Sequence, residues 1–149
     1  MSRGFEDEEN RAVEVIPGLI LGGYYELKEI LSMNPDVLFP LDRAPGSIWD
    51  DGFRGEIVYF PITDYSILPD DVLDRLVDAV VERLRAGKRV GLFCIGGHGR
   101  TGYVASCVIY MMLGVGKPIS YLRDHYTYKA VETMEQVHAI ERFQERHPL

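Results

Sequence analysis

Residues 93–102 read Phe93-Cys94-Ile95-Gly96-Gly97-His98-Gly99-Arg100-Thr101-Gly102 and separate two apolar runs. The run before them, Arg89 to Cys94, has the length and composition of a buried strand. The run after them, Thr101 to Leu113, is apolar on nearly every face, as a buried helix is. Open α/β sheets bind their ligands at the carboxyl ends of strands. This stretch therefore predicts an α/β fold with Cys94 at the end of a central strand.

The turn between the two runs has the composition of an anion-binding loop with a nucleophile at its base. Backbone N–H groups of a glycine-rich turn can converge on one tetrahedral oxyanion, and the following helix adds its positive N-terminal end. Arg100 supplies a planar fork that can hold two phosphate oxygens. The same surroundings stabilise a thiolate, so we interpret Cys94 as a nucleophile. The loop predicts hydrolysis of a phosphate ester through a phosphocysteine.

A nucleotide-binding loop and a zinc site both fit this sequence poorly. A nucleotide-binding loop requires Gly-x4-Gly-Lys-Ser/Thr, and Gly97 stands where the lysine belongs after Gly91 and Gly96. Two cysteines and four histidines invite a zinc site, but no Cys-x2-Cys or His-x3-His spacing supports one. We therefore predict neither a bound metal nor a cofactor.

Size and charge limit the domain organisation and the partners. A chain of 149 residues is long enough for one well-buried domain, and we expect a flexible acidic arm over residues 1–12 and a single catalytic domain over residues 13–149. A net charge of −7 argues against binding to nucleic acid or to an anionic membrane. The acidic N-terminus does not resemble a secretory signal, and two cysteines make no disulfide framework. We expect a cytoplasmic monomer.

The rest of the chain alternates short apolar runs with amphipathic segments. We predict a hairpin over residues 15–22, a short helix over 25–33, strands over 36–41 and 56–62, a helix over 70–86, a short helix over 118–122 and a last helix over 131–146. The predicted fold class is α/β, with a central, mostly parallel sheet of about four to five strands flanked by helices.

Residues 93–102 resemble the signature loop of the cysteine-dependent protein tyrosine phosphatase superfamily, and most of all its small dual-specificity branch. Two other segments match: Tyr59-Phe60-Pro61-Ile62-Thr63-Asp64 resembles the acid-bearing loop, and Val131-Glu132-Thr133-Met134-Glu135-Gln136 resembles the late glutamine-bearing segment. The resemblance covers roughly residues 15–145. Low-molecular-weight phosphatases carry their cysteine near the N-terminus, so that branch is disfavoured.

This resemblance implies a fold like that of the phosphotyrosine phosphatases and a role for each matched residue. The catalytic residues would be Cys94, Arg100, Asp64 and Thr101. Cys94 attacks phosphorus, Asp64 protonates the leaving group and then activates water, and Thr101 assists the departing thiolate. The substrate-binding set would be Ile95, Gly96, Gly97, His98, Gly99, Arg100 and Gln136, the last positioning the hydrolytic water.

Several of these assignments have alternatives in the residues themselves. Thr101 also fits a cap of the following helix, and Gln136 fits a solvated glutamine on an amphipathic helix. Asp70 and Asp71 rival Asp64 as the acid, although their place at a helix start already accounts for them. His98 either contacts substrate at the rim of the pocket or points outward.

One departure from the family pattern concerns the position before the cysteine. The family usually has histidine there, and this chain has Phe93. The loop amides, the helix end and Arg100 remain, so we expect an active thiol that is tuned differently.

The predicted activity is hydrolysis of phosphotyrosine and of phosphoserine or phosphothreonine in proteins, and the expected partner is a phosphorylated protein or peptide. A non-catalytic module that binds phosphorylated residues is one alternative. A phosphatase of RNA 5′-phosphates or of phosphoinositides is another, although the loop lacks the lysines of lipid-specific members. Rhodanese-like enzymes share the Cys-x5-Arg pattern but require no upstream acid.

Overall fold

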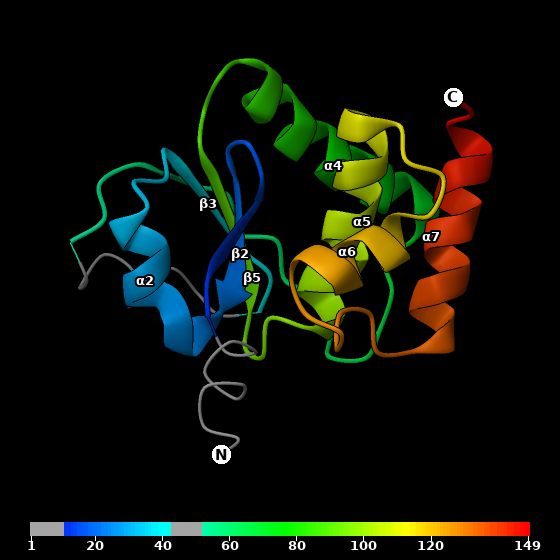
Figure 1. Cartoon of the computed structure of the whole chain (residues 1–149), viewed down its shortest axis with the longest axis horizontal. Coiled ribbons are helices and arrows are strands. Elements are labelled where there is room, and N and C mark those ends of the chain that lie inside the picture. The colour runs from blue at the N-terminus through cyan, green and yellow to red at the C-terminus, as the bar shows by residue number, and fades with distance from the viewer. Residues whose placement is uncertain (1–10, 43–51) are drawn as a thin grey trace.

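The computed structural model describes residues 11–42 and 52–149, and in them one sheet organises the fold (Figure 1). Its five strands lie in the order β1-β2-β5-β3-β4. They are β1 (Val13–Ile16), β2 (Leu19–Gly23), β3 (Val37–Pro40), β4 (Glu56–Ile57) and β5 (Val90–Cys94). β1 runs antiparallel to β2, and the other neighbouring pairs are parallel. The predicted mostly parallel sheet and the predicted N-terminal hairpin are confirmed.

Helices cover both faces of this sheet. A short 3₁₀ turn, η1 (Tyr24–Glu26), leads into α2 (Leu27–Ser32) on one face. Figure 1 shows the remaining helices on the other side of the sheet. They are α4 (Asp70–Arg85), α5 (Gly99–Leu113), α6 (Pro118–His125) and α7 (Met134–Arg146). Helix α5 is buried from Gly99 through Tyr110 and ends at Gly114, whose left-handed backbone (φ 69°) is typical of a helix end.

The alternation of side chains along β5 divides the core in two. Val90, Leu92 and Cys94 belong to the larger apolar cluster, which includes residues of α4, α5 and α7. Phe93 points to the other face, because successive residues of a strand do so. There it is fully buried in the smaller cluster with Ile30 of α2. The residue that replaces the family histidine is therefore a core residue beneath α2.

Some boundaries differ from the predictions. Regular pairing in β4 ends at Ile57 and does not reach residue 62, although Val58 and Phe60 still donate backbone hydrogen bonds to the carbonyls of Leu38 and Pro40. Pro40 has no N–H to return such a bond, so the ladder becomes one-sided there. Helix α5 begins at Gly99, earlier than expected, and α7 begins at Met134, later than expected.

Most of the predicted N-terminal arm, residues 1–12, lies outside the described residues. Ala12, its last residue, is buried, and its N–H donates to the Glu29 carboxylate. Among the described helices, none alone is long and apolar enough to cross a membrane; α5 and α6 reach that threshold only as a pair, bent by 106° at the break between them.

Candidate active site

Strand β5 carries Cys94 to the carboxyl end of the sheet, where Cys94 lies in register with Gly23 of β2. The loop after β5 crosses the end of β2 closely enough to require glycine. A Cβ at Gly23 would lie 2.7 Å from the Ile95 carbonyl oxygen, and one at Gly97 would lie 2.7 Å from the Gly23 nitrogen. Gly97 also has a φ of +76°, which favours glycine. Gly97, predicted as part of the anion-binding loop, thus also allows that loop to pack against the end of β2.

The Cys94 thiol is buried, with 2% of the residue exposed, and two donors point at it. The Gly97 N–H lies 3.2 Å from Sγ, and the Thr101 hydroxyl donates to Sγ at 3.0 Å. Both contacts stabilise a negative charge on sulfur. The N-cap position of α5 is His98, so the cap interpretation does not describe Thr101. Thr101 instead contacts the sulfur of Cys94, the thiolate whose departure it is predicted to assist.

Arg100 is buried in the first turn of α5, with 6% of the residue exposed. Its Nη1 donates to the Ile62 carbonyl at 3.0 Å. Its Nη2 lies 3.8 Å from Asp42 Oδ2 and 3.5 Å from Asp64 Oδ1. The buried Nε–H has no hydrogen-bond partner within residues 11–42 and 52–149. A buried donor of this kind requires a partner, and a phosphate oxygen would supply one.

A cavity of about 200 Å³ opens above the thiol. Its lining comprises Asp64, Tyr65, Cys94, Ile95, Gly96, His98, Gly99, Arg100 and Glu132. The predicted binding residues therefore come together here, except for two. Gly97 lies underneath, with its amide directed at the sulfur, and Gln136 is not in the lining. His98 is in the lining, which favours its interpretation as a pocket residue.

Of the three candidate acids, Asp64 alone reaches this cavity. Asp70 pairs with Arg142 and Arg146 of α7, and Asp71 pairs with Arg75 on its own helix. Asp64 is half-exposed, and its Oδ1 accepts a hydrogen bond from the Tyr65 N–H at 3.0 Å. The geometry therefore favours Asp64 as the proton donor of this pocket.

Gln136 is fully buried and caps α7, so the interpretation as a solvated residue is wrong. Its Oε1 accepts from the backbone N–H groups of Glu132 at 2.7 Å and Thr133 at 3.2 Å. The Thr133 side chain accepts from the Gln136 N–H in return, which completes a capping box. The side chain predicted to position water thus holds the backbone beside the pocket residue Glu132.

Sequence reasoning does not find three residues of this site: Asp42, Tyr126 and Glu132. Asp42 and Tyr126 lie far from the signature loop in sequence, and no local pattern marks them. Glu132 stands inside the segment that resembles the glutamine-bearing one. The nearness of this carboxylate in sequence to Gln136 is the one signal that could identify Glu132 as a site residue.

Tyr126, at the end of α6, holds one peptide of the loop. Its hydroxyl donates to the Gly97 carbonyl at 2.6 Å. Burial raises the pKa of Tyr126 well above its usual value, and the nearby charges of Cys94 and Glu26 add to the effect. The phenol therefore remains a donor over the whole working pH range. With its carbonyl held in this way, the peptide that follows Gly97 has one orientation.

Tyr126→Phe should lower kcat/KM for an aryl phosphate about fivefold. The lost hydrogen bond contributes about 1 kcal/mol, and the freed peptide then rotates out of the competent loop geometry part of the time. Steady-state kinetics on the variant measure the effect. Tyr121→Phe, on the same helix but stacked on His125 outside the pocket, is the matched control. Equal values of kcat/KM for the two variants would contradict the role of Tyr126.

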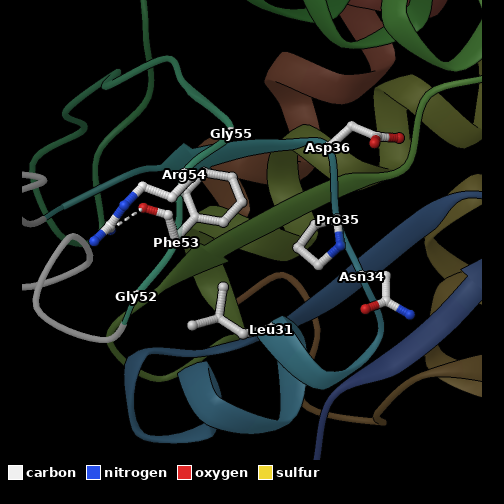
Figure 2. A pocket seen from close by; sticks show the side chains of 8 residues that line it. All are labelled: Leu31, Asn34, Pro35, Asp36, Gly52, Phe53, Arg54 and Gly55. Atoms are coloured by element: carbon white, nitrogen blue, oxygen red, sulfur yellow. Dashed lines mark hydrogen bonds between the residues drawn. The ribbon is translucent and has the colours of Figure 1, made fainter.

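A second, larger hollow of about 440 Å³ lies at the opposite end of the sheet (Figure 2). Its lining comprises Leu31, Asn34, Pro35, Asp36, Gly52, Phe53, Arg54 and Gly55. Strands β3 and β4 begin there, and Figure 2 shows the Arg54 guanidinium turned back to the Phe53 carbonyl, to which it donates at 3.0 Å. Among the described residues, the lining of this hollow contains no thiol, hydroxyl or imidazole group, so we place the candidate active site at Cys94.

Comparison with known proteins gives one matching family and several similar structures. The family model PTP-SAK, described as a Swiss Army Knife protein, DSP-PTPase phosphatase domain, matches residues 49–147. Two uncharacterized proteins of Methanocaldococcus jannaschii are 43% identical to this chain over 79 residues, or 53% of its length. That alignment covers 53% of one relative and 49% of the other, so the chain spans about half the length of the curated relatives it matches.

Among solved structures, Tk-PTP in its active form has a TM-score of 0.78 at 24% identity, covering 91% of this chain and 97% of that one. PTPMT1 in complex with PI(5)P has a TM-score of 0.75 at 11% identity, covering 91% and 95% of the two chains. The human tyrosine phosphatase-like serine/threonine/tyrosine-interacting protein has a TM-score of 0.72 at 13% identity, covering 94% and 99%. At these identities the likeness shows the fold.

Proposed function

We propose that this chain hydrolyses phosphate monoesters of protein tyrosine and of serine or threonine through a phosphocysteine. It belongs to the PTP-SAK family of DSP-PTPase phosphatase domains. Family membership confirms the predicted resemblance to the small dual-specificity branch and supports a phosphatase. The substrate class and the covalent intermediate are our proposal.

One observation carries the proposal: a doubly hydrogen-bonded sulfur and a buried guanidinium face the same cavity. Cys94 Sγ has its two donors, and the Arg100 Nε–H has no partner in the described part of the chain. Phosphoryl transfer depends on an in-line nucleophile and on stabilisation of the equatorial oxygens. Cys94 and Arg100 would supply these two requirements.

The reaction would proceed in two steps. In the first, the Cys94 thiolate attacks phosphorus, the bond to the leaving oxygen breaks, and the Asp64 carboxyl gives that oxygen its proton. In the second, the ionised carboxylate takes a proton from water as the water attacks phosphorus. The S–P bond breaks, and the thiolate returns to the Gly97 amide and the Thr101 hydroxyl.

The residues at the rim of the cavity favour a phosphopeptide as the substrate over a polyanion. Tyr65 and Ile95, which are 60% and 38% exposed, offer apolar surface to an aromatic leaving group. The carboxylates of Asp64 and Glu132 lie in the same lining and would repel additional phosphates. Phosphoinositides and RNA 5′-triphosphates carry such additional negative charge.

We expect a phosphotyrosyl peptide to give the highest kcat/KM in a substrate panel and a phosphoseryl peptide a lower one. A phosphatidylinositol monophosphate and a 5′-triphosphorylated RNA should give the lowest values, and phosphate release measures all four. As a matched control, each peptide is made with lysines or with glutamates flanking the phosphoresidue, and the acidic rim favours the lysines. Faster release from the lipid or the RNA than from every peptide would overturn the proposed substrate, and binding without release would identify a binding module.

A further inference from the structure

We propose that Glu132 is a second acid–base residue of this pocket and shares proton transfer to the leaving group with Asp64. This inference rests on the proposed hydrolysis, which by itself requires a single carboxyl.

Glu132 enters the cavity directly beside the signature loop. Its carboxyl group lies over Gly99, the first residue of α5, where a Cβ would collide with Oε1 and would lie 3.0 Å from Cδ. Gly99 immediately precedes Arg100, the residue proposed to bind the phosphate. Because Glu132 and Asp64 both line the cavity above Cys94, both carboxyl groups face the space that a leaving group would occupy.

The backbone that carries Glu132 is fixed from several directions. Gln136 Oε1 accepts from the Glu132 N–H, and the preceding Val131 N–H donates to the His98 carbonyl at 3.1 Å. Arg123 of α6 donates to the carbonyls of Ala130 and Val131. These contacts fix the backbone at Glu132, while its side chain stays exposed in the lining of the cavity.

Val131 supplies a second sign that this position is under constraint. Its φ is +67°, a left-handed conformation that is a genuine outlier for a β-branched residue and costs about 1–3 kcal/mol. Tyr65, next to Asp64, also has a positive φ, +61°. Each pocket carboxylate is therefore adjacent to a strained non-glycine residue, a feature that clusters at functional sites.

The electrostatic surroundings of Glu132 suit a proton donor. The titratable and charged groups that line the cavity with it are Asp64, Tyr65, Cys94, His98 and Arg100. Partial burial raises the pKa of Glu132, the Asp64 charge raises it further, and Arg100 opposes the change. Glu132 therefore keeps its proton to a higher pH than an isolated glutamate, and a shift in this direction favours a general acid.

The proton balance is the same for either carboxyl. The Glu132 O–H bond breaks as the leaving oxygen takes the proton and its bond to phosphorus breaks. In the hydrolytic step the Glu132 carboxylate takes a proton from water, whose oxygen forms the new bond to phosphorus while the S–P bond breaks. Since two carboxyl groups are available, loss of one leaves a reduced but measurable activity.

The test is Glu132→Gln, compared on two aryl phosphates. The leaving group of phenyl phosphate is a basic phenolate, which needs a proton as it departs. The leaving group of p-nitrophenyl phosphate is a much less basic phenolate, which depends far less on proton transfer. We expect kcat/KM on phenyl phosphate to fall about 10²-fold and on p-nitrophenyl phosphate less than about tenfold. The basic limb of the pH profile of kcat/KM should move to lower pH, because the carboxyl with the raised pKa is gone.

Three further variants complete the experiment. Glu135→Gln, in the exposed first turn of α7 outside the cavity, should behave like the wild type. Glu132→Asp, which keeps a carboxyl, should restore part of the basic limb. Asp64→Asn combined with Glu132→Gln should be at least about tenfold slower on phenyl phosphate than either single variant.

The inference is overturned if Glu132→Gln matches Glu135→Gln on both substrates with an unmoved basic limb. It is also overturned if the double variant is no slower than Asp64→Asn. If the wild type hydrolyses neither ester, the proposed function itself fails, and that outcome is distinct from the other two.

Discussion

Cys94→Ser loses turnover of an aryl phosphate by more than about 10⁴-fold, the scale on which removal of a covalent nucleophile acts in other hydrolases. Serine keeps the size of the side chain, but its hydroxyl is a far weaker nucleophile than a thiolate with two donors. The loop, the Arg100 guanidinium and the positive end of α5 all remain. Binding of tungstate, an analogue of phosphate, should therefore stay measurable by calorimetry.

Cys107→Ala is the matched control for this experiment. Cys107 is fully buried in the middle of α5, and burial raises the pKa of its thiol. A thiol in that state is neutral and inert, so the substitution should leave a small cavity and turnover close to that of the wild type. Turnover by Cys94→Ser comparable to that of Cys107→Ala would show that the nucleophile is another group.

Arg100→Lys should lower kcat/KM by roughly 10³-fold or more, equivalent to about 4 kcal/mol of transition-state stabilisation. Lysine keeps the positive charge beside Asp42 and Asp64 but loses the planar fork. An ammonium has three donors on one nitrogen, so it lacks the separate nitrogens with which arginine can hold two equatorial oxygens side by side and still donate to the Ile62 carbonyl. Steady-state kinetics should show a fall in kcat together with weaker inhibition by inorganic phosphate.

Arg75→Lys provides the comparison for the arginine variant. Arg75 lies on the exposed face of α4, where it pairs with Asp71 one turn away. Exposed pairs of this kind contribute little to stability, so the control should keep both activity and the free energy of unfolding. An Arg100→Lys enzyme within about tenfold of this control would mean that charge alone is sufficient in the pocket.

The part of the site that can be predicted is the part built from neighbours in sequence. Cys94, Arg100 and Thr101 are fixed relative to one another by one strand end and one helix start, so their spacing already encodes their geometry. Asp64 is predictable because it follows an apolar run that ends at the same edge of the sheet. For these residues the local sequence pattern is sufficient to predict their relative positions in the fold.

The residues that escape prediction act across long loops. Tyr126 reaches Gly97 from α6, and Asp42 reaches Arg100 from the end of β3, so both contacts depend on how whole elements pack. Gln136 shows the same limit in another way. Its amphipathic surroundings suggest solvent, but the start of α7 turns its side chain inward to cap the helix. The sequence pattern predicts which helix a residue belongs to, but the packing of whole elements determines which groups that residue contacts.

The position of β5 in the middle of the sheet has a consequence for how the pocket opens locally. β5 pairs with β2 and with β3, and its residues are fully or nearly buried. Amide hydrogens in such a strand exchange through the least frequent opening events, whereas segments outside regular elements exchange through frequent ones. Cys94 thus ends a strand whose amides we expect to exchange slowly, while Asp64 stands on a connecting segment. Warming would loosen the segment of Asp64 before it loosened the strand of Cys94, so phosphate binding would persist to a higher temperature than hydrolysis at the full rate.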